Sequence, residues 1–173
     1  AKLDKYKRAV ELCTRALTIQ KQLFGESNSG YATILNDLAL YYSELGDNSK
    51  AIELGTQAME IDKRVLGETD PNYATTLDNL ALYYTHVGDY TKAIELGTQA
   101  MKIRKNILGE YHTDYATSLN NVAMFYSYLG YYSKAIELGT QALEIRKRVL
   151  GESLPSYATS FSNLADDYSH LGE

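Results

Sequence analysis

The chain has 173 residues, of which 45% are apolar, and it carries a formal net charge of −5. That length and apolar content are enough for the core of one ordinary domain. No apolar run approaches the roughly 18 residues of a membrane-spanning helix, and the net charge argues against a nucleic-acid partner. The single cysteine, Cys13, excludes an internal disulfide. The sequence lacks an Asn-x-Ser/Thr site, which favours a cytoplasmic location.

The sequence repeats itself every 42 residues. The eight letters AIELGTQA occur at 51–58, 93–100 and 135–142, and most of the flanking residues return with them. A period of this length is typical of proteins built from stacked repeats. We therefore expect one array over residues 1–173, without a linker. It has a leading helix in 1–30, full repeats at 31–72, 73–114 and 115–156, and a final helix in 157–173.

The spacing of apolar residues predicts two helices in each repeat. In the second repeat Leu77, Leu80, Ala81 and Tyr84 recur at steps of three and four residues, and a second stripe begins at Ala93. A strand would need a period of two, which is absent. We name the first helix of each repeat A and the second B. In chain order the patterns predict B over 3–23, A over 30–45, B over 48–66, A over 72–87, B over 90–108, A over 114–129, B over 132–150 and A over 156–171.

These residues resemble the tetratricopeptide repeat family. Its small helix-A residue matches Ala39, Ala81, Ala123 and Ala165, and its turn glycine matches Gly46, Gly88, Gly130 and Gly172. The 42-residue form, with stretches such as ALEIRKRVLGE, is similar to the repeats of kinesin light chains. The resemblance implies an all-α, right-handed superhelical solenoid of eight helices with open ends. It also implies that the family tyrosine Tyr84 lies in the core, where buried phenols find hydrogen-bond partners.

Glycines inside the B helices depart from this family pattern. Gly55, Gly97 and Gly139 stand where the family usually has an aromatic residue, and Tyr41, Tyr83 and Phe125 stand where it usually has alanine. The paired departures predict a volume swap, in which each glycine is buried against one of these rings from a neighbouring A helix. In the first B helix the same position holds Cys13. The alternative is that the glycines are exposed and merely copied by duplication.

No motif for catalysis, a metal or a cofactor is present. His86 and His170 occupy the same repeat position two units apart, which is too far for shared metal ligation, and paired Cys/His spacing is missing. Cys13 lies on a predicted apolar face, so an inert thiol is favoured over a nucleophile. The adjacent acids Asp166 and Asp167 point about 100° apart on a helix. The sequence therefore predicts a protein that is not an enzyme.

Charge is distributed unevenly between the two kinds of helix. The A segments 31–45, 73–87, 115–129 and 157–171 contain acids but no Lys or Arg, and so carry the whole net charge of −5. In the tetratricopeptide family the A helices line a concave, peptide-binding face. The cations with which some members, and kinesin light chains, hold acidic ligands are not matched here. The resemblance thus implies a neutral-to-acidic groove for apolar or basic peptides, formed by Asp37, Glu44, Thr75, Asn79, Leu82, His86, Thr117, Asn121, Met124, Tyr128 and Asn163.

Three functions are compatible with the sequence. The first is a protein–protein interaction scaffold, in which the groove asparagines pair with a peptide or, alternatively, only cap and solvate the helices. The second is a structural repeat array without a peptide ligand. The third is a sensor array of a larger signalling protein.

The two ends of the array also predict self-association. The first B helix lacks an A partner before it, and the final A helix lacks a B partner after it. Apolar stripes remain open on both, including Leu3, Leu12 and Leu17 at one end and Ala158, Phe161 and Leu164 at the other. Because these faces match by repeat register, we expect head-to-tail stacking of copies. A two-fold contact between like ends is the alternative.

Overall fold

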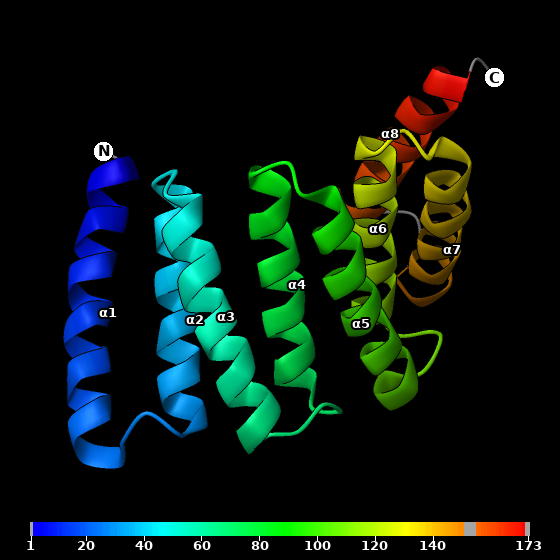
Figure 1. Ribbon diagram of the computed structural model, residues 1–173. Helices are drawn as coiled ribbons and strands as arrows, with labels where there is room; N and C mark the ends of the chain where they lie inside the picture. The colour runs from blue at the N-terminus through cyan, green and yellow to red at the C-terminus, as the bar shows by residue number, and fades with distance from the viewer. Residues whose placement is uncertain (1, 151–154, 172–173) are drawn as a thin grey trace. The chain divides into compact units, whose positions relative to one another are not determined.

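The computed structural model describes residues 2–150 and 155–171, and of residues 155–160 it describes the backbone alone. Over these residues the chain is all helical, without a strand (Figure 1). The all-α prediction is confirmed, and each predicted helix boundary lies within one residue of the observed one. The predicted turn residue Gly172 and the side chain of Ala158 lie outside the described part. The helices are α1 (Lys2–Phe24), α2 (Ser29–Glu44), α3 (Asn48–Val65), α4 (Pro71–His86), α5 (Tyr90–Leu108), α6 (Thr113–Tyr128), α7 (Tyr132–Leu150) and α8 (Pro155–Leu171).

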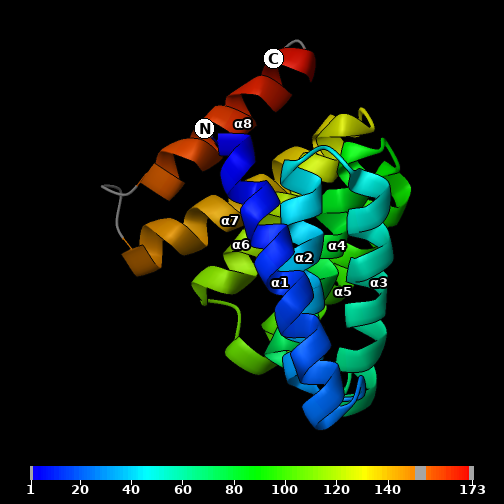
Figure 2. The same ribbon diagram turned by 90° about the vertical axis from the view of Figure 1, so that its left-hand side faces the viewer.

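The helices form two compact units, residues 1–89 with α1–α4 and residues 90–173 with α5–α8. In the first unit each helix packs on the next in sequence, and α2 also contacts α4 (Figures 1 and 2). In the second unit α5 packs on α6, α6 on α7 and α7 on α8, and α6 also contacts α8. Consecutive A helices therefore lie beside one another within each unit, as a shared binding face requires.

Local sequence signals fix where the helices begin and end. The Asp70 side chain accepts a hydrogen bond from the Asn72 backbone N–H at 2.8 Å, and Pro71 occupies the first turn of α4. After α2 and α4 the chain reverses at Gly46 and Gly88, with φ of 87° and 80°. Residues with a side chain rarely adopt this left-handed backbone conformation, which explains the glycine at both turns.

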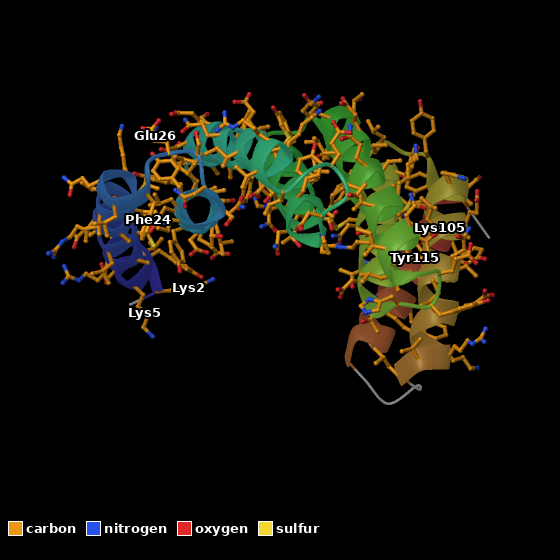
Figure 3. The ribbon with its side chains drawn as sticks, turned by 90° about the horizontal axis from the view of Figure 1, so that it is seen from below. Lys2, Lys5, Phe24, Glu26, Lys105 and Tyr115 are labelled. Atoms are coloured by element: carbon orange, nitrogen blue, oxygen red, sulfur yellow. The ribbon has the colours of Figure 1, made fainter. Side chains whose placement is uncertain are left out.

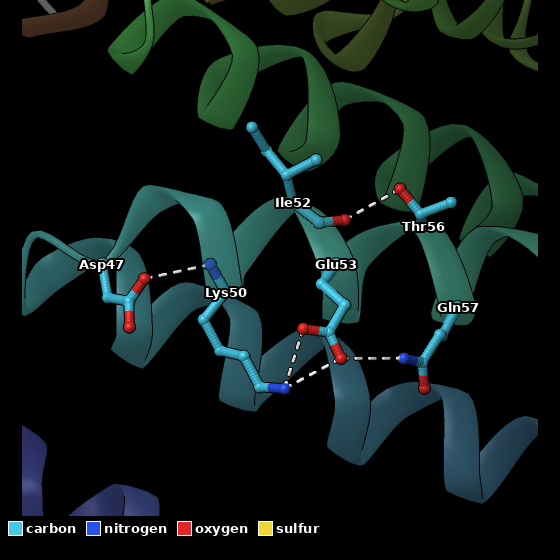
Figure 4. A network of polar contacts seen from close by, with 6 residues as sticks. All are labelled: Asp47, Lys50, Ile52, Glu53, Thr56 and Gln57. Atoms are coloured by element: carbon cyan, nitrogen blue, oxygen red, sulfur yellow. Dashed lines mark hydrogen bonds and ion pairs between the residues drawn. The ribbon is translucent and has the colours of Figure 1, made fainter.

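Small residues occupy the helix crossings, and polar residues cover the outer faces. The alanines at the crossings are fully buried, among them Ala51 and Ala58 of α3. On the surface Lys105 of α5 lies 6.0 Å from the ring centroid of Tyr115 of α6 (Figure 3). On the outer face of α3 the ammonium of Lys50 pairs with Glu53 at 2.8 Å (Figure 4). In α2, α3, α4, α6 and α7 this division places leucines and alanines in the core, whereas α1 has no buried residue.

Of two adjacent tyrosines in α4, the one that the volume swap places against a glycine is buried, and the family tyrosine is not. Tyr84 is half-buried, whereas its neighbour Tyr83 is only 3% exposed. Burial raises the pKa of Tyr83 to about 12. Among the described residues the buried Tyr83 hydroxyl has no hydrogen-bond partner, so the expectation that buried phenols find partners is wrong here. Adjacent helical residues point about 100° apart, and the ring at 83 is the one that faces α3.

The helix-B glycines are buried, and two of the three contact a ring as predicted. A Cβ placed on Gly55 would lie 3.4 Å from Tyr83 Cε2, and one on Gly97 would lie 3.0 Å from Phe125 Cε2. Each ring comes from the A helix that follows. The prediction is wrong for Gly139, where the nearest side-chain atom is Leu164 Cδ1 at 3.5 Å. Tyr83, Phe125 and Asp167 occupy the same position in successive repeats. In the third of these repeats the residue is therefore an aspartate, and the ring is missing.

This difference predicts opposite effects of the same substitution. Gly97→Ala should lower the free energy of unfolding by about 1–3 kcal/mol, because the new methyl group meets Phe125 and the buried Val122 side chain. Gly139→Ala should raise it by about 0.5–1 kcal/mol, because the methyl makes an ordinary contact and helix propensity improves. Urea titration of both variants checks the pair. Equal effects at the two sites would contradict the packing account.

Candidate functional site

Three helices of the first unit surround a polar cavity of about 340 Å³, here called the first-unit cavity. Three of its lining residues, Asp37 of α2 and Thr75 and Asn79 of α4, belong to the groove set predicted from the sequence. The structure therefore brings Asp37 together with Thr75 and Asn79, from which it is separated by 38 or more residues in sequence. The complete lining is Ser29, Thr33, Asn36, Asp37, Asp62, Leu66, Asn72, Thr75, Thr76 and Asn79.

A short hydrogen-bonded chain forms the buried side of the first-unit cavity. The hydroxyl of Thr76 donates to Asp62 Oδ2 at 2.7 Å and accepts a bond from Asn36 Nδ2, also at 2.7 Å. Asp62 is only 4% exposed although it carries a carboxylate. Because Thr76 uses its hydroxyl in both directions, the three side chains hold one another in a fixed arrangement.

Electrostatics make the first-unit cavity acidic. Burial raises the pKa of Asp62, the nearby Asp70 charge adds to this effect, and the bond from Thr76 opposes it. Partial burial also raises the pKa of Asp37, which keeps more than a third of its surface in solvent. The lining contains these two carboxylates and neither Lys nor Arg. A cationic or neutral group is therefore favoured in this space over an anion.

The other predicted residues of the first unit lie outside this cavity. Glu44 is exposed and pairs with Lys2 at 3.2 Å. Hydrogen bonds from Tyr6 and then Lys2 lower the pKa of that carboxyl. His86 is exposed, with its Nδ1 3.0 Å from the Ser43 hydroxyl, and Leu82 is half-buried. The structure thus divides the predicted set of this unit into a cavity group and a separate surface group.

The second unit has its own cavity, of about 160 Å³, here called the second-unit cavity. It is lined by the predicted residues Met124, Tyr128 and Asn163. It also includes Gly139 and Asp167, the pair at which the aromatic ring is missing. The complete lining is Asn120, Ala123, Met124, Ser127, Tyr128, Gly139, Asn163, Leu164, Asp166 and Asp167.

Thr117 and Asn121 do not line the second-unit cavity, and basic groups approach this part of α6. Arg146 of α7 is 8% exposed and its guanidinium donates to the Thr117 hydroxyl at 3.4 Å. Arg104 of α5 donates to the Ser118 hydroxyl at 2.7 Å. Burial lowers the pKa of Arg146. Counting charges on the A segments did not anticipate these contacts, because both cations come from B helices.

Sequence reasoning missed the residue with the most unusual surroundings. Asp62 stands in the stretch MEIDKRVLGE, and Arg104 and Arg146 occupy the same place in MKIRKNILGE and LEIRKRVLGE. A reversal of charge at one position of an otherwise repeated stretch was the available signal. It also falls on the inward stripe of helix B, next to a buried or half-buried isoleucine.

The remaining features to consider are the single thiol, groups of metal-ligand side chains and helices that could cross a membrane. Cys13 is half-buried, and burial followed by the Asp37 charge raises the pKa of its thiol. A raised thiol pKa disfavours the reactive thiolate. In residues 2–150 and 155–171 no group of three or more His, Cys, Asp or Glu side chains suits a metal ion. Within the same residues, none of the helices has the length and apolarity needed to cross a bilayer.

Comparison with known proteins agrees with the repeat pattern and the helix pairs. The family model described as "Tetratricopeptide repeat" matches residues 1–64, 56–106, 72–148 and 114–173, which together span the chain. The chain belongs to the tetratricopeptide repeat family. No curated protein matches it.

Solved structures of this family are similar over nearly all of the chain. A kinesin light chain-like repeat protein of Podosopora anserina is 27% identical, with a TM-score of 0.85 over 98% of this chain and 80% of that one. A substituted form of the same fungal protein gives a TM-score of 0.86. BtubC (BKLC) from P. vanneervenii is 23% identical, with a TM-score of 0.87 over 97% of this chain and 67% of that one. The likeness to BtubC shows the fold alone.

The buried carboxylate of Asp62 predicts a pH-dependent stability difference. Because its folded-state pKa is raised above the ordinary 3.8, the charged form is disfavoured by folding, and this cost disappears as pH falls through the raised value. Asp62→Asn keeps an acceptor for Thr76 and removes the charge. It should therefore increase the free energy of unfolding at pH 7, and the gain should shrink as the pH falls below the raised pKa and vanish below the ordinary value of 3.8.

Urea titrations at several pH values measure this difference. Glu60→Gln, at an exposed position of the same helix, is the matched control and should leave stability nearly unchanged at pH 7. A less stable Asp62→Asn protein at pH 7, or a gain that persists unchanged in acid, would contradict the assignment.

Proposed function

We propose that the chain is a non-enzymatic protein–protein interaction scaffold whose A-helix faces bind apolar or basic peptide segments. Tetratricopeptide repeats generally mediate protein–protein interaction, and extended faces of repeated helices suit that role. The observation that carries the proposal is the first-unit cavity, where Asp37, Thr75 and Asn79 share one space with a second carboxylate and no basic residue. Such a lining attracts basic segments and opposes acidic ones.

The second-unit cavity supports the apolar part of the proposal. Met124 and Tyr128 provide adaptable and aromatic contact surface, which binding sites use for varied apolar side chains. Asn163, in the same lining, carries both a donor and an acceptor for a peptide backbone. Met124 and Tyr128 therefore suit an apolar side chain, while Asp166 and Asp167 of the same lining oppose an acidic one.

A peptide array probed with the 173-residue chain tests the proposal. Basic or apolar peptides should dominate the binders, and a predominance of Asp/Glu-rich peptides would contradict it. Asn79→Arg, which adds a cation to the first-unit cavity, should weaken basic binders by about tenfold or more. Gln57→Arg adds the same charge at an exposed position of α3 and should leave their affinity nearly unchanged.

Self-association is the second candidate function, and the exposure of α1 favours it. Leu12 is 51% exposed, whereas Leu54, at the same repeat position in α3, is 7% exposed. Phe161 of α8 is also exposed. By repeat register, the face of α8 on one copy would cover the position of Leu12 on another. This is a heterologous contact, which produces open chains unless the rotation closes.

Sedimentation over a range of protein concentrations tests head-to-tail stacking. The average mass should grow beyond two copies as concentration rises. Leu12→Lys should suppress this growth, and Gln22→Lys, at another exposed position of α1, should not. A mass that stops at two copies would favour contact between like ends, and a constant monomer mass would exclude both contacts.

A further inference from the structure

The carboxylate of Asp62 is buried without a counter-charge. Its Oδ2 accepts the bond from Thr76, while among the described residues its Oδ1 has no hydrogen-bond partner and neither oxygen has an ion-pair partner. The charge that acts on its pKa is that of another acid, Asp70, which adds to the effect of burial. Burial of the residue disfavours its charged form, so a cation or hydrogen-bond donors that reach the unused oxygen would stabilise it. Asp62 lines the first-unit cavity, so such a group can come from that space.

Further acceptors lie around the same cavity. Asn36 gives its Nδ2 hydrogen to Thr76, and its buried Oδ1 has no partner among the described residues. Asp37 adds a second carboxylate, and Asn72 and Asn79 contribute amide oxygens. A ligand that fits this lining therefore carries positive charge and several hydrogen-bond donors.

The second unit holds a guanidinium at the repeat position of Asp62. Arg104 replaces Asp62 in the repeat, and Ser118 replaces Thr76. Where Thr76 donates to Asp62 at 2.7 Å, the Arg104 guanidinium donates to the Ser118 hydroxyl at the same distance. The same pair of repeat positions thus holds a guanidinium in one unit and a short carboxylate facing a cavity in the other.

Arginine matches the first-unit cavity better than other cations do. A guanidinium presents five donors in a planar fork, whereas an ammonium presents a compact charge with three. A metal ion is disfavoured because the cavity offers two carboxylates, and no metal-binding group of three or more such ligands occurs among the described residues. The volume of about 340 Å³ lies within the usual range for ligand pockets, about 300–1,000 Å³.

We propose that the first-unit cavity is an arginine pocket, in which Asp62 Oδ1 accepts the guanidinium of an arginine side chain from a partner peptide. Asp37 and the cavity asparagines accept the remaining guanidinium hydrogens. This inference rests on the proposed peptide-binding function and names the side chain that the first unit selects. Thr76 is a positioning residue, because its hydroxyl holds the carboxylate and leaves the second oxygen available.

The test is a titration of the isotope-labelled 173-residue chain, followed by amide NMR. The probe is the peptide acetyl-Ala-Arg-Ala-amide, and the matched peptides carry citrulline or lysine in place of arginine. Citrulline keeps the shape of arginine and removes its charge. The arginine peptide should shift the side-chain amides of Asn36, Asn72 and Asn79 saturably. The citrulline peptide should bind at least about tenfold more weakly, and the lysine peptide should lie between them.

Variants distinguish binding in the first-unit cavity from general electrostatic attraction of the peptide to the acidic chain. Asp62→Asn keeps the acceptor for Thr76 and should weaken the arginine peptide by about tenfold or more. Glu60→Gln changes the net charge equally at an exposed site of the same helix and should retain the wild-type affinity. Asp62→Arg, which copies the residue of the second unit, should abolish binding. Thermal unfolding followed by circular dichroism identifies any variant that has lost its fold.

Two results would overturn the arginine pocket. One is an Asp62→Asn protein that binds the arginine peptide as tightly as the wild type, and the other is a lysine or citrulline peptide that binds as tightly as arginine. Failure of this inference differs from failure of the proposed function. If the pocket alone is wrong, array peptides still bind and Asn79→Arg still weakens them. If the scaffold function is wrong, basic and apolar peptides bind neither the wild type nor the variants.

Discussion

The close crossing of each B helix with the next A helix is the contact on which each unit depends. Glycine at 55 and 97 lets a ring from the next A helix lie against the backbone, and fully buried alanines extend the same contact along the helices. Without a side chain at the glycine, the ring of Tyr83 or Phe125 fills the space that an aromatic residue of helix B would otherwise occupy. This packing fixes how each A helix is rotated, and therefore which of its side chains reach a cavity.

The third crossing shows the effect of changing one partner of this contact. Gly139 remains, but the ring position holds Asp167, which is 5% exposed. The space beside Gly139 belongs to the second-unit cavity, which also includes Met124 and Tyr128. At this crossing a cavity with a carboxylate in its wall thus replaces a packed ring, while the helix pair itself is kept.

One B-helix position holds opposite charges in the two units. Asp62 and Arg104 each meet a hydroxyl on the following A helix, with opposite charge and opposite direction of the hydrogen bond. The backbone arrangement is the same, so neighbouring repeats can offer different electrostatics without a change of fold. A buried carboxylate lowers stability at neutral pH, and its retention is compatible with a role in binding.

The sequence by itself determined the helices, their boundaries and the family, because the 42-residue period and its turn glycines repeat and capping residues such as Asp70 are local signals. It also predicted the burial of Gly55 and Gly97, since two opposite departures in volume compensate each other. The same compensation placed the Tyr83 ring inside, but only the tertiary structure decided that Tyr84 is half-buried and that the Tyr83 hydroxyl has no partner among the described residues. The tertiary structure alone brought Asp62 beside Asp37 and Asn79, because these residues come from three different helices. Periodicity states which face of a helix is apolar, whereas a cavity depends on how side chains from several helices meet.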